Sequence, residues 1–477
     1  MIELNPEMQR RFAVEVVQRL RGERFSAYWA GGCVRDRMLG RLPGDYDVAT
    51  NATPEEIRRL FGPRRTLAIG AAYGVIVVLG PPGAGHVEVT TFRSDVDYRD
   101  GRHPSRVVYS SPKEDAQRRD FTINGMFFDP LAEQVIDFVG GQEDLQRRVV
   151  RAIGDPRARF AEDKLRMLRA VRFAARFEFE LDPATAAAIR EMAAEIVVVS
   201  AERIAAEMET MLLDKHRARA MRMLRGVGLL AVILPEVGAT VGATAGATAG
   251  ATAGARDEEQ GARGEGRGAR DENNEAAWEQ MVNLLDALAD ASFPLALAVL
   301  LLGASDPLAP RPSPLAPSAL VPRPSSHAPA APAALAEQVG RRWRLAKKQF
   351  ERAGWLLEHR AALVEARRLP WSRLQPLLVH EGAGELLAFG DAFAACGFMD
   401  AAEMAFCRER LAMPAAQLNP PPLFTGDDLL KLGVPRGHVY AELLQKVREA
   451  QLDGQIKDRA DAVELVKRFL DDARPPG

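Results

Sequence analysis

The pattern of apolar residues changes once along the chain, and this change limits the folds that the chain can adopt. Up to about residue 150, short β-branched runs such as Val75–Leu79 and His86–Phe92 alternate with helical segments. Such runs predict strands. From about Asp155 onward the apolar residues recur at helical spacing only. We therefore predict an α+β protein, in which an N-terminal α/β domain with a mixed sheet is followed by an all-helical C-terminal region.

Local signals in the N-terminal region mark where individual elements begin. Thr53 and Ser111 are each followed by Pro and, three residues on, by Glu. This spacing is typical of a helix N-cap with a capping box. The apolar runs 27–30 and 135–138 predict two further strands. In the helical region, Asp182 and Ser200 are expected to begin helices.

Composition excludes several classes of protein. The 477 residues include 63 Lys and Arg and 65 Asp and Glu, a formal net charge of −2, so any nucleic-acid binding must come from a local basic patch. The three cysteines, Cys33, Cys396 and Cys407, include no C-x-x-C pair, which excludes a disulfide framework and favours a reducing compartment. The N-terminus is typical of an amphipathic helix, and the longest apolar run, Phe293–Leu302, is too short to span a bilayer. We expect a cytoplasmic protein with no membrane association.

Two low-complexity segments interrupt the helical region. A Gly-Ala-Thr-Ala repeat runs from Gly238 to Ala255 and continues into a Gly/Arg/Glu-rich run that ends at Glu275. The segment Ala304–Pro332 is rich in Pro, Ala and Ser. Such compositions cannot bury an apolar core. We predict that both segments are linkers or surface insertions.

The first candidate motif is a glycine turn in the string GGCVRD. Gly31 and Gly32 lie between a predicted strand and a helical segment. Glycines at such a junction let the backbone approach phosphate oxygens closely, and a helix start offers free N–H groups to an anion. Arg35 can add a guanidinium. We predict a phosphate-binding turn here.

Asp45 and Asp47 follow this turn and are two residues apart. Residues i and i+2 of a strand share a face, and carboxylates beside substrate phosphates are typical Mg²⁺ ligands. We predict that this pair binds Mg²⁺ and is catalytic. Glu88, in a strand-like run, is either a further catalytic carboxylate of the same site or an ordinary exposed strand residue.

The second motif, RRDFTING, begins at Arg118. Arg119 could hold a phosphate or a ribose, and Asp120 could orient it. The alternative is an arginine-rich helix end, which the helix dipole favours.

The third motif is the predicted helix EDKLRMLRAVRFAARF. Arg166, Arg169, Arg172 and Arg176 lie along one edge of it, apart from an apolar stripe. Asp163 and Arg166 are three residues apart, and together they offer a hydrogen-bond acceptor and a donor. Cytosine and adenine present the matching amino group and ring nitrogen, whereas uracil and guanine do not. The alternative is an intrahelical ion pair.

Together these motifs resemble the bacterial-type (class II) tRNA nucleotidyltransferase and poly(A) polymerase family, within the DNA polymerase β-like nucleotidyltransferases. The matching strings follow the family's order within about residues 20–215: GGCVRD, GDYDVAT, VEVTTFR, DGRHP, RRDFTING, EDKLRMLRAVRFAARF and SAERIAAEMETML. The strings TGDDLLKLGVPRG and EAQLDGQI are similar to the family's tail region.

The resemblance implies an enzyme that adds C, C and A to the 3′ end of tRNA from CTP and ATP, with Mg²⁺ as cofactor and pyrophosphate as product. It implies that Asp45 and Asp47 bind the metal and that the helix at Ser200 braces the helix that reads the base. The residues that it assigns to nucleotide binding are Gly31, Gly32, Arg35, Arg119, Asp163, Arg166, Arg169 and Arg172.

The segment Arg93–Val107 matches the family's loop associated with switching to ATP, which argues against a CC-only enzyme. A-adding and CC-adding enzymes and a poly(A) polymerase stay open as alternatives within the family. An inactive RNA-binding module is the alternative from another class. The oligomeric state stays open as well.

We predict the following order of segments. They are a nucleotidyltransferase catalytic (head) domain at 1–150, a helical nucleotide-recognition (neck) domain at 151–235, a low-complexity insert at 236–275, a helical body at 276–303 and 333–415 that is divided by a Pro/Ala-rich insert at 304–332, and an RNA-binding helical tail at 416–477. We expect the helical half to hold the acceptor end of tRNA. The basic stretch 341–348 is either an RNA contact or a solubilising helix face, and Trp343 and Trp355 are expected to be core anchors.

Overall fold

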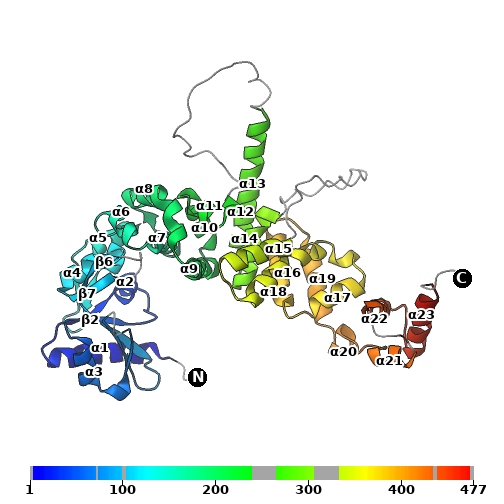
Figure 1. The fold of residues 1–477 in the computed structure, drawn as a ribbon, viewed down its shortest axis with the longest axis horizontal. Coiled ribbons are helices and arrows are strands. Elements are labelled where there is room, and N and C mark those ends of the chain that lie inside the picture. Colours follow the sequence, from blue (N-terminus) through cyan, green and yellow to red (C-terminus); the bar gives the residue numbers. More distant parts are fainter. Residues whose placement is uncertain are drawn as a thin grey trace. The chain divides into compact units, whose positions relative to one another are not determined.

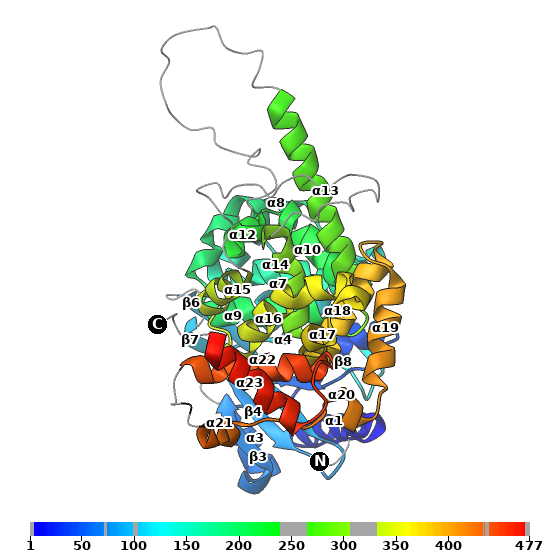
Figure 2. The same cartoon turned by 90° about the vertical axis from the view of Figure 1, so that its right-hand side faces the viewer.

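The computed structural model describes residues 4–70, 74–98, 104–238, 265–305, 332–432, 434 and 438–472. The chain divides into two compact units, residues 1–238 and 239–477 (Figures 1 and 2). The Gly-Ala-Thr-Ala repeat, most of the Pro/Ala-rich segment and residues 99–103 of the predicted switching loop lie outside the described residues. The division of the chain into head, neck, body and tail therefore stays a prediction.

The first unit contains a seven-stranded mixed sheet, whose strands lie in the order β3-β4-β5-β2-β1-β8-β9. Neighbouring strands are antiparallel except β2 and β5, which are parallel. The predicted strands 27–30, 75–79, 86–92 and 135–138 are confirmed to within two residues at each end. The strands of this sheet are β1 (Ala27–Ala30), β2 (Asp47–Thr50), β3 (Thr66–Gly70), β4 (Val75–Leu79), β5 (His86–Thr91), β8 (Phe127–Asp129) and β9 (Gln134–Ile136).

Helices α1 (Pro6–Gly22) and α3 (Pro54–Phe61) pack against this sheet (Figure 1). Both predicted capping boxes are present: the Thr53 and Ser111 side chains accept hydrogen bonds from the backbone three residues on, and α3 and α4 (Pro112–Gln117) begin there. The other short elements of this region are α2 (Gly32–Met38), η1 (Pro63–Arg65), η3 (Thr122–Asn124) and α5 (Gly141–Arg147).

The segment that matches the switching loop is, where it is described, a pair of strands. β6 (Arg93–Tyr98) and β7 (Pro104–Tyr109) form a separate antiparallel two-stranded sheet. Arg93 at the start of β6 follows Phe92, which is fully buried next to the main sheet. The hairpin therefore leaves the sheet at a fixed point.

The rest of the first unit is helical apart from a short parallel pair, β10 (Val149–Val150) and β11 (Glu180–Leu181). Helix α7 packs against α6, α9 and α10. Its predicted apolar stripe is fully buried from Met167 to Ala174, which explains why this stripe and the arginine edge separate. The helices are α6 (Pro156–Glu162), α7 (Leu165–Phe177), α8 (Pro183–Met192), η4 (Ala193–Val198), α9 (Ala201–Leu213), α10 (Arg217–Gly226), α11 (Leu229–Ile233) and α12 (Pro235–Gly238).

In the second unit every described element is helical. α13 (Glu265–Ala287) begins earlier than the expected residue 276, because helix-forming Ala, Arg and Glu surround its glycines. α14 (Phe293–Ser305) is apolar along its length and buried from Leu295 to Leu302. The remaining helices are α15 (Pro332–Arg342), α16 (Lys347–Val364), η5 (Ala366–Arg368), α17 (Trp371–Leu378), α18 (Ala383–Ala395), α19 (Ala401–Leu411), α20 (Ala415–Leu418), α21 (Gly426–Lys431), α22 (His438–Leu452) and α23 (Arg459–Asp472).

The last three helices share an apolar cluster of their own, which extends from Phe424 to Val466. Trp343 is buried, as expected of a core anchor, whereas Trp355 is half-buried and stacks on His380 with ring centres 3.9 Å apart. In the basic stretch, Lys347 and Lys348 lie near acidic side chains.

These elements confirm the predicted α+β fold.

The three cysteines are free. Within the described ranges, no helix has both the length and the apolar character needed to cross a bilayer.

Candidate active site

A cavity of about 910 Å³ in the first unit is lined by every residue that the sequence analysis assigned to the site. The sheet contributes residues from β1, β2, β4 and β5 to its walls, and α7 contributes the arginine edge. Its volume falls within the usual range for small-molecule pockets. The predicted site residues in the lining are Gly31, Gly32, Arg35, Asp45, Asp47, Glu88, Arg119, Asp163, Arg166, Arg169 and Arg172.

The carboxylates predicted to be catalytic lie on two neighbouring strands and in the bend before one of them. Asp47 begins β2 and lies beside Glu88 of β5 in the parallel register. Asp45 lies in a bend before β2, so the prediction that both aspartates belong to the strand is wrong for Asp45. The reason is that pairing with β1 begins only at Asp47, while the intervening Tyr46 is buried edge-on against Trp29, with ring centres 4.8 Å apart.

These carboxylates differ from the other acidic groups of the cavity. In the described part of the chain, Asp45, Asp47 and Glu88 make no side-chain hydrogen bond or ion pair. The other acidic side chains of the lining, at positions 36, 120 and 163, each pair with an arginine. Burial, together with the charges of Asp45 and Glu88, raises the pKa of Asp47 to about 7, although Arg119 opposes this.

A divalent cation would offset the repulsion among these groups, and carboxylate oxygens next to a phosphate site suit Mg²⁺. No set of three or more His, Cys, Asp or Glu side chains within the described ranges is arranged to hold a metal. Asp45 and Asp47 would supply two carboxylate ligands, and substrate phosphates and water would have to complete the coordination of the ion.

The glycine turn brings Arg119 close to the backbone. Gly31 has φ +73°, and a Cβ atom there would lie 3.1 Å from Nη1 of Arg119 and 3.9 Å from Oδ2 of Asp47. Only glycine adopts such a backbone conformation readily. The turn thus lies between the carboxylate pair and a guanidinium.

Arg35 is buried, and much of its hydrogen-bonding capacity is used within the protein. Its Nε donates to Asp36 at 2.9 Å and its Nη1 donates to Asn124 Oδ1 at 2.7 Å. The guanidinium also lies 4.4 Å from the ring centre of Phe177. Burial lowers the pKa of Arg35, and the neighbouring Asp36 carboxylate counteracts this. Arg35 lines the cavity, and these contacts within the protein hold its guanidinium in place.

Asp120 does not orient Arg119, and the prediction that it does is wrong. Arg119 donates instead to Asp115 of α4, at 3.0 and 3.2 Å. Asp115 lies three and four residues before Arg118 and Arg119, which is the spacing of neighbours on a helix. Asp120, past the end of α4, turns toward α7 and accepts two hydrogen bonds from Arg169.

The predicted pair of Asp163 and Arg166 is not formed, although both line the cavity. Asp163 lies between α6 and α7 in extended conformation, because α7 begins only at Leu165. Its carboxylate accepts from Arg203 of α9 at 2.7 and 3.2 Å. Arg166 donates to Glu162 at 2.5 Å.

Helix α9 braces α7, as the resemblance implied. Glu207 of α9 lies 2.7 Å from Arg172 and 3.9 Å from Arg169. The sequence analysis missed Asp115, Arg203 and Glu207. For Asp115 the available signal was its spacing of three and four residues before Arg118 and Arg119. Arg203 and Glu207 pair with residues that are distant in the sequence, so spacing gave no signal for them.

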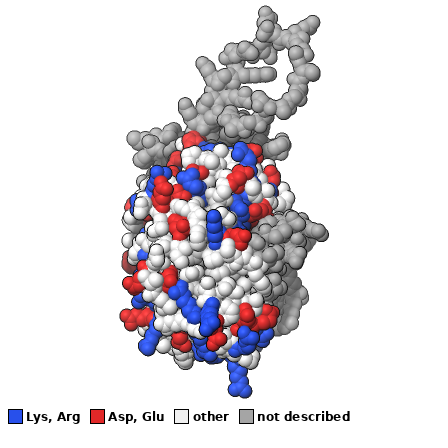
Figure 3. Space-filling view, turned by 90° about the vertical axis from the view of Figure 1, so that its left-hand side faces the viewer, with Lys and Arg blue, Asp and Glu red and all other residues white. Residues whose placement is uncertain are grey.

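On the face drawn in Figure 3, the described basic and acidic side chains are interspersed. This agrees with the net charge of −2. The arginines of α7 and the turn gather at the cavity. These arginines would attract an anionic ligand to the cavity.

Residues 27–151 match the family model of the poly A polymerase head domain. This segment of the chain is therefore similar to poly A polymerase head domains. The matched residues include the glycine turn, all three carboxylates and Arg119, and the match confirms the resemblance seen in the motifs. Residues 178–240 match a family described as a probable RNA- and SrmB-binding site of polymerase A.

Curated relatives that share the head domain are CCA-adding enzymes. The one from Geobacillus stearothermophilus is 41% identical over 222 residues, which are 46% of this chain and 54% of the relative. The one from Enterococcus faecalis is 42% identical over 206 residues, 43% of this chain and 50% of the relative. The chain thus spans about half the length of the curated relatives it matches.

Solved structures extend the likeness beyond the head domain. The match to the Bacillus stearothermophilus CCA-adding enzyme in complex with CTP covers 98% of this chain and 98% of that one, with a TM-score of 0.69 and 26% identity. The Thermotoga maritima CCA-adding enzyme complexed with tRNA covers 96% of this chain and 95% of that one, with a TM-score of 0.58 and 20% identity. At that identity the second likeness shows the fold alone.

Proposed function

We propose that the protein adds C, C and A to the 3′ end of tRNA without a nucleic-acid template, using CTP and ATP and releasing pyrophosphate. The observation that carries this proposal is that one cavity is lined by the unpaired Asp45 and Asp47 and by the arginine edge of α7. Support also comes from curated relatives named CCA-adding enzymes and from a similar CCA-adding enzyme solved with CTP.

Asp45 and Asp47 would hold Mg²⁺, which when bound lowers the pKa of an attacking hydroxyl and neutralises charge on pyrophosphate. The Gly31 turn lets a triphosphate approach the backbone, and Arg119 beside it attracts the phosphate oxygens. The tRNA 3′-hydroxyl then attacks the α-phosphorus. Reactions of this kind depend mainly on positioning and on charge stabilisation. Glu88 adds a negative charge beside Asp47 and is proposed as a further catalytic carboxylate.

For base choice we propose Asp163 and Arg166. A carboxylate oxygen of Asp163 would accept from the amino group of cytosine or adenine, and a guanidinium N–H of Arg166 would donate to the adjacent ring nitrogen. Hydrogen bonds with Arg203 and Glu162 hold Asp163 and Arg166, respectively, in place. Residues 151–235 would then form the nucleotide-recognition domain, with Arg169 and Arg172 completing its binding edge.

Binding of tRNA is proposed for the helical half, including the tail at 416–477. The match of residues 178–240 to an RNA-binding family supports this for the first part of that half. Contacts to the acceptor end would be mainly to phosphates and to shape, as is typical of RNA duplex recognition. We propose that the reaction takes place in the cytoplasm, where mature tRNA is used.

The test is to incubate the purified full chain with Mg²⁺, labelled CTP and ATP, and tRNA that lacks its three terminal nucleotides. The proposal predicts extension by C, C and A and no further. Addition of CC alone, of A alone or of a long A tail would each identify one of the alternative activities. Binding of tRNA without any extension would favour an inactive RNA-binding module, and the Asp45→Asn variant is the matched control for metal-dependent extension.

A further inference from the structure

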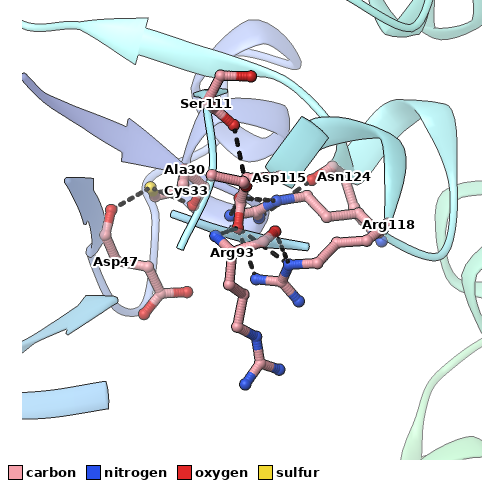
Figure 4. Close-up of polar contacts among 10 residues, drawn as sticks. Ala30, Cys33, Asp47, Arg93, Ser111, Asp115, Arg118 and Asn124 are labelled. Atoms are coloured by element: carbon pink, nitrogen blue, oxygen red, sulfur yellow. Dashed lines mark hydrogen bonds and ion pairs between the residues drawn. The ribbon is translucent and has the colours of Figure 1, made fainter. Parts of the chain in front are cut away.

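Asp115 on α4 is a fully buried acidic residue with an unusual number of partners. One oxygen accepts from Nε and Nη2 of Arg118, at 3.0 and 2.7 Å, and from the backbone N–H of Arg93 at 3.3 Å. The other oxygen accepts from Nε and Nη2 of Arg119, at 3.2 and 3.0 Å. Figure 4 shows Asp115 at the centre of these contacts.

The two contacts to Arg119 fix the plane of its guanidinium. Because Nε and Nη2 point at the same oxygen, the group cannot rotate about its long axis without losing both bonds. Its remaining nitrogen, Nη1, is the atom beside Gly31, and it donates a long bond of 3.4 Å to the Asn124 carbonyl. Asp115 therefore determines which face of Arg119 meets the glycine turn.

The contacts on the other oxygen connect the same carboxylate to the rest of the site. Arg118 donates its Nε to the Arg93 carbonyl at 3.0 Å, at the point where the β6–β7 hairpin leaves the sheet. Arg166 of α7 donates to the Arg118 carbonyl at 3.4 Å. Asp115 itself is absent from the cavity lining. Its influence on a ligand must pass through the arginines.

We propose that Asp115 is a positioning residue for nucleotide binding, which aims Arg119 at the triphosphate and touches no part of the nucleotide. This rests on the proposed function only in taking a nucleoside triphosphate as the ligand of the cavity. Burial raises the pKa of Asp115, and Arg119 and Arg118 outweigh it, so that the pKa lies below its ordinary value and the group is charged.

A purely structural role makes a different prediction. Removing one partner of a buried ion pair destabilises the fold because the other charge is left uncompensated. Such a loss lowers the melting temperature but leaves phosphate affinity of the folded protein unchanged. A positioning role instead weakens binding of any ligand that carries the triphosphate, whatever its base.

The experiment measures the Kd of CTP, ATP and inorganic tripolyphosphate with the full chain, in Mg²⁺ and without tRNA, for the wild type and Asp115→Asn. We expect all three ligands to bind about 10- to 100-fold more weakly to the variant, by similar factors. The matched control is Asp129→Asn. Asp129 is a buried aspartate of β8 that pairs with Arg21 at 2.7 Å, outside the cavity. It should lower the melting temperature and leave the three Kd values unchanged.

Two further variants keep the inference testable if Asp115→Asn does not fold. Arg119→Lys keeps the charge but loses the paired N–H groups, so positioning by Asp115 predicts that it binds as weakly as Arg119→Ala. In the folded case, Asp115→Asn should add little to the loss already caused by Arg119→Ala.

Unchanged Kd values in folded Asp115→Asn, full additivity of the two changes, or wild-type affinity in Arg119→Lys would each overturn the inference. A wild type that binds none of the three ligands would instead contradict the proposed function, so the two failures are distinguishable.

Discussion

Arg169 of α7 donates two hydrogen bonds, at 2.7 and 3.0 Å, to Asp120, which follows α4 in the head domain. This contact joins the strand-bearing part of the first unit to the helix that carries the arginine edge. Asn124 extends it, since its Nδ2 donates to Asp120 at 3.1 Å while its Oδ1 accepts from Arg35. The phosphate side and the proposed base side of the cavity are thus connected through protein groups.

The contact predicts a pH dependence of stability. Burial opposes ionisation of Asp120, but Arg169 and the hydrogen bonds outweigh it and lower the pKa to about 2. A depressed carboxylate pKa stabilises the fold above the unfolded value of about 4, and this stabilisation is lost as the pH falls from about 4 to about 2. Asp120→Asn should therefore reduce the free energy of unfolding by about 2 kcal/mol at pH 6. Denaturant unfolding between pH 2 and pH 7 measures the difference, and a gap of constant size across that range would contradict the assignment.

Replacing either aspartate of the proposed metal site should abolish nucleotide addition. Asp45→Asn and Asp47→Asn each remove a charge from the carboxylate pair, and we expect the rate to fall about a thousandfold or more. Neither side chain has a protein partner to lose in the described residues, so the melting temperature should stay close to that of the wild type. Single-turnover incorporation of labelled CTP measures the effect. Asp290→Asn, at an exposed position of the second unit, is the control, and a wild-type rate for Asp45→Asn would refute the metal assignment.

In the Gly31→Ala variant, the affinity for nucleotide should fall more than the stability of the fold. A methyl group there would meet Nη1 of Arg119 at 3.1 Å, whereas at Gly40, which also has a positive φ of +69°, it would meet nothing within 4 Å. Both substitutions strain the backbone, and the strain is greater at Gly31, whose ψ of −129° lies outside the left-handed helical region. Comparing the Kd of CTP with the melting temperature for the two variants separates strain from contact. Equal losses of affinity in Gly31→Ala and Gly40→Ala would argue against a phosphate site at the turn.

Arg166→Ala should relax the choice of base. If Arg166 donates to the ring nitrogen, its removal costs about 1 to 3 kcal/mol of discrimination, or roughly 10- to 100-fold. Competition between CTP, ATP, UTP and GTP on the same tRNA acceptor measures the preference. Arg157→Ala, which removes a surface arginine paired with Glu191, is the control. An Arg166→Ala enzyme with unaltered preference for C and A would show that the reading pair is misassigned.

The elements of the fold that were predictable have a local cause. The strands 75–79 and 86–92 and the helix starts at Thr53 and Ser111 depend on residues within a few positions of each other, and they are present as expected. The order of strands could not be predicted, because the parallel pairing of β2 with β5 joins segments about 40 residues apart. The early start of α13 was not predicted, because the glycine content of residues 265–275 indicated a low-complexity segment although helix-forming Ala, Arg and Glu also occur there.

For the site, the sequence predicted which residues line the cavity but not how they pair. Asp163 and Arg166 fit a helical spacing of three, yet Asp163 lies outside α7 and binds Arg203 instead. Asp120 was expected to orient its neighbour Arg119, but Asp115 does so from within α4. The partner that each side chain binds depends on residues that are distant in the sequence, and spacing along the chain does not identify those residues. The set of residues that line the cavity was predictable because each of them belongs to one of the motifs.

The most direct test of the account is a structure of the full chain with Mg²⁺ and an unreactive CTP analogue. The account predicts that the metal lies between Asp45, Asp47 and the triphosphate, that Arg119 contacts the phosphates, and that the edge of the cytosine faces Asp163 and Arg166. A nucleotide bound elsewhere, or bound in this cavity with its phosphates against α7 and its base near Asp47, would contradict it.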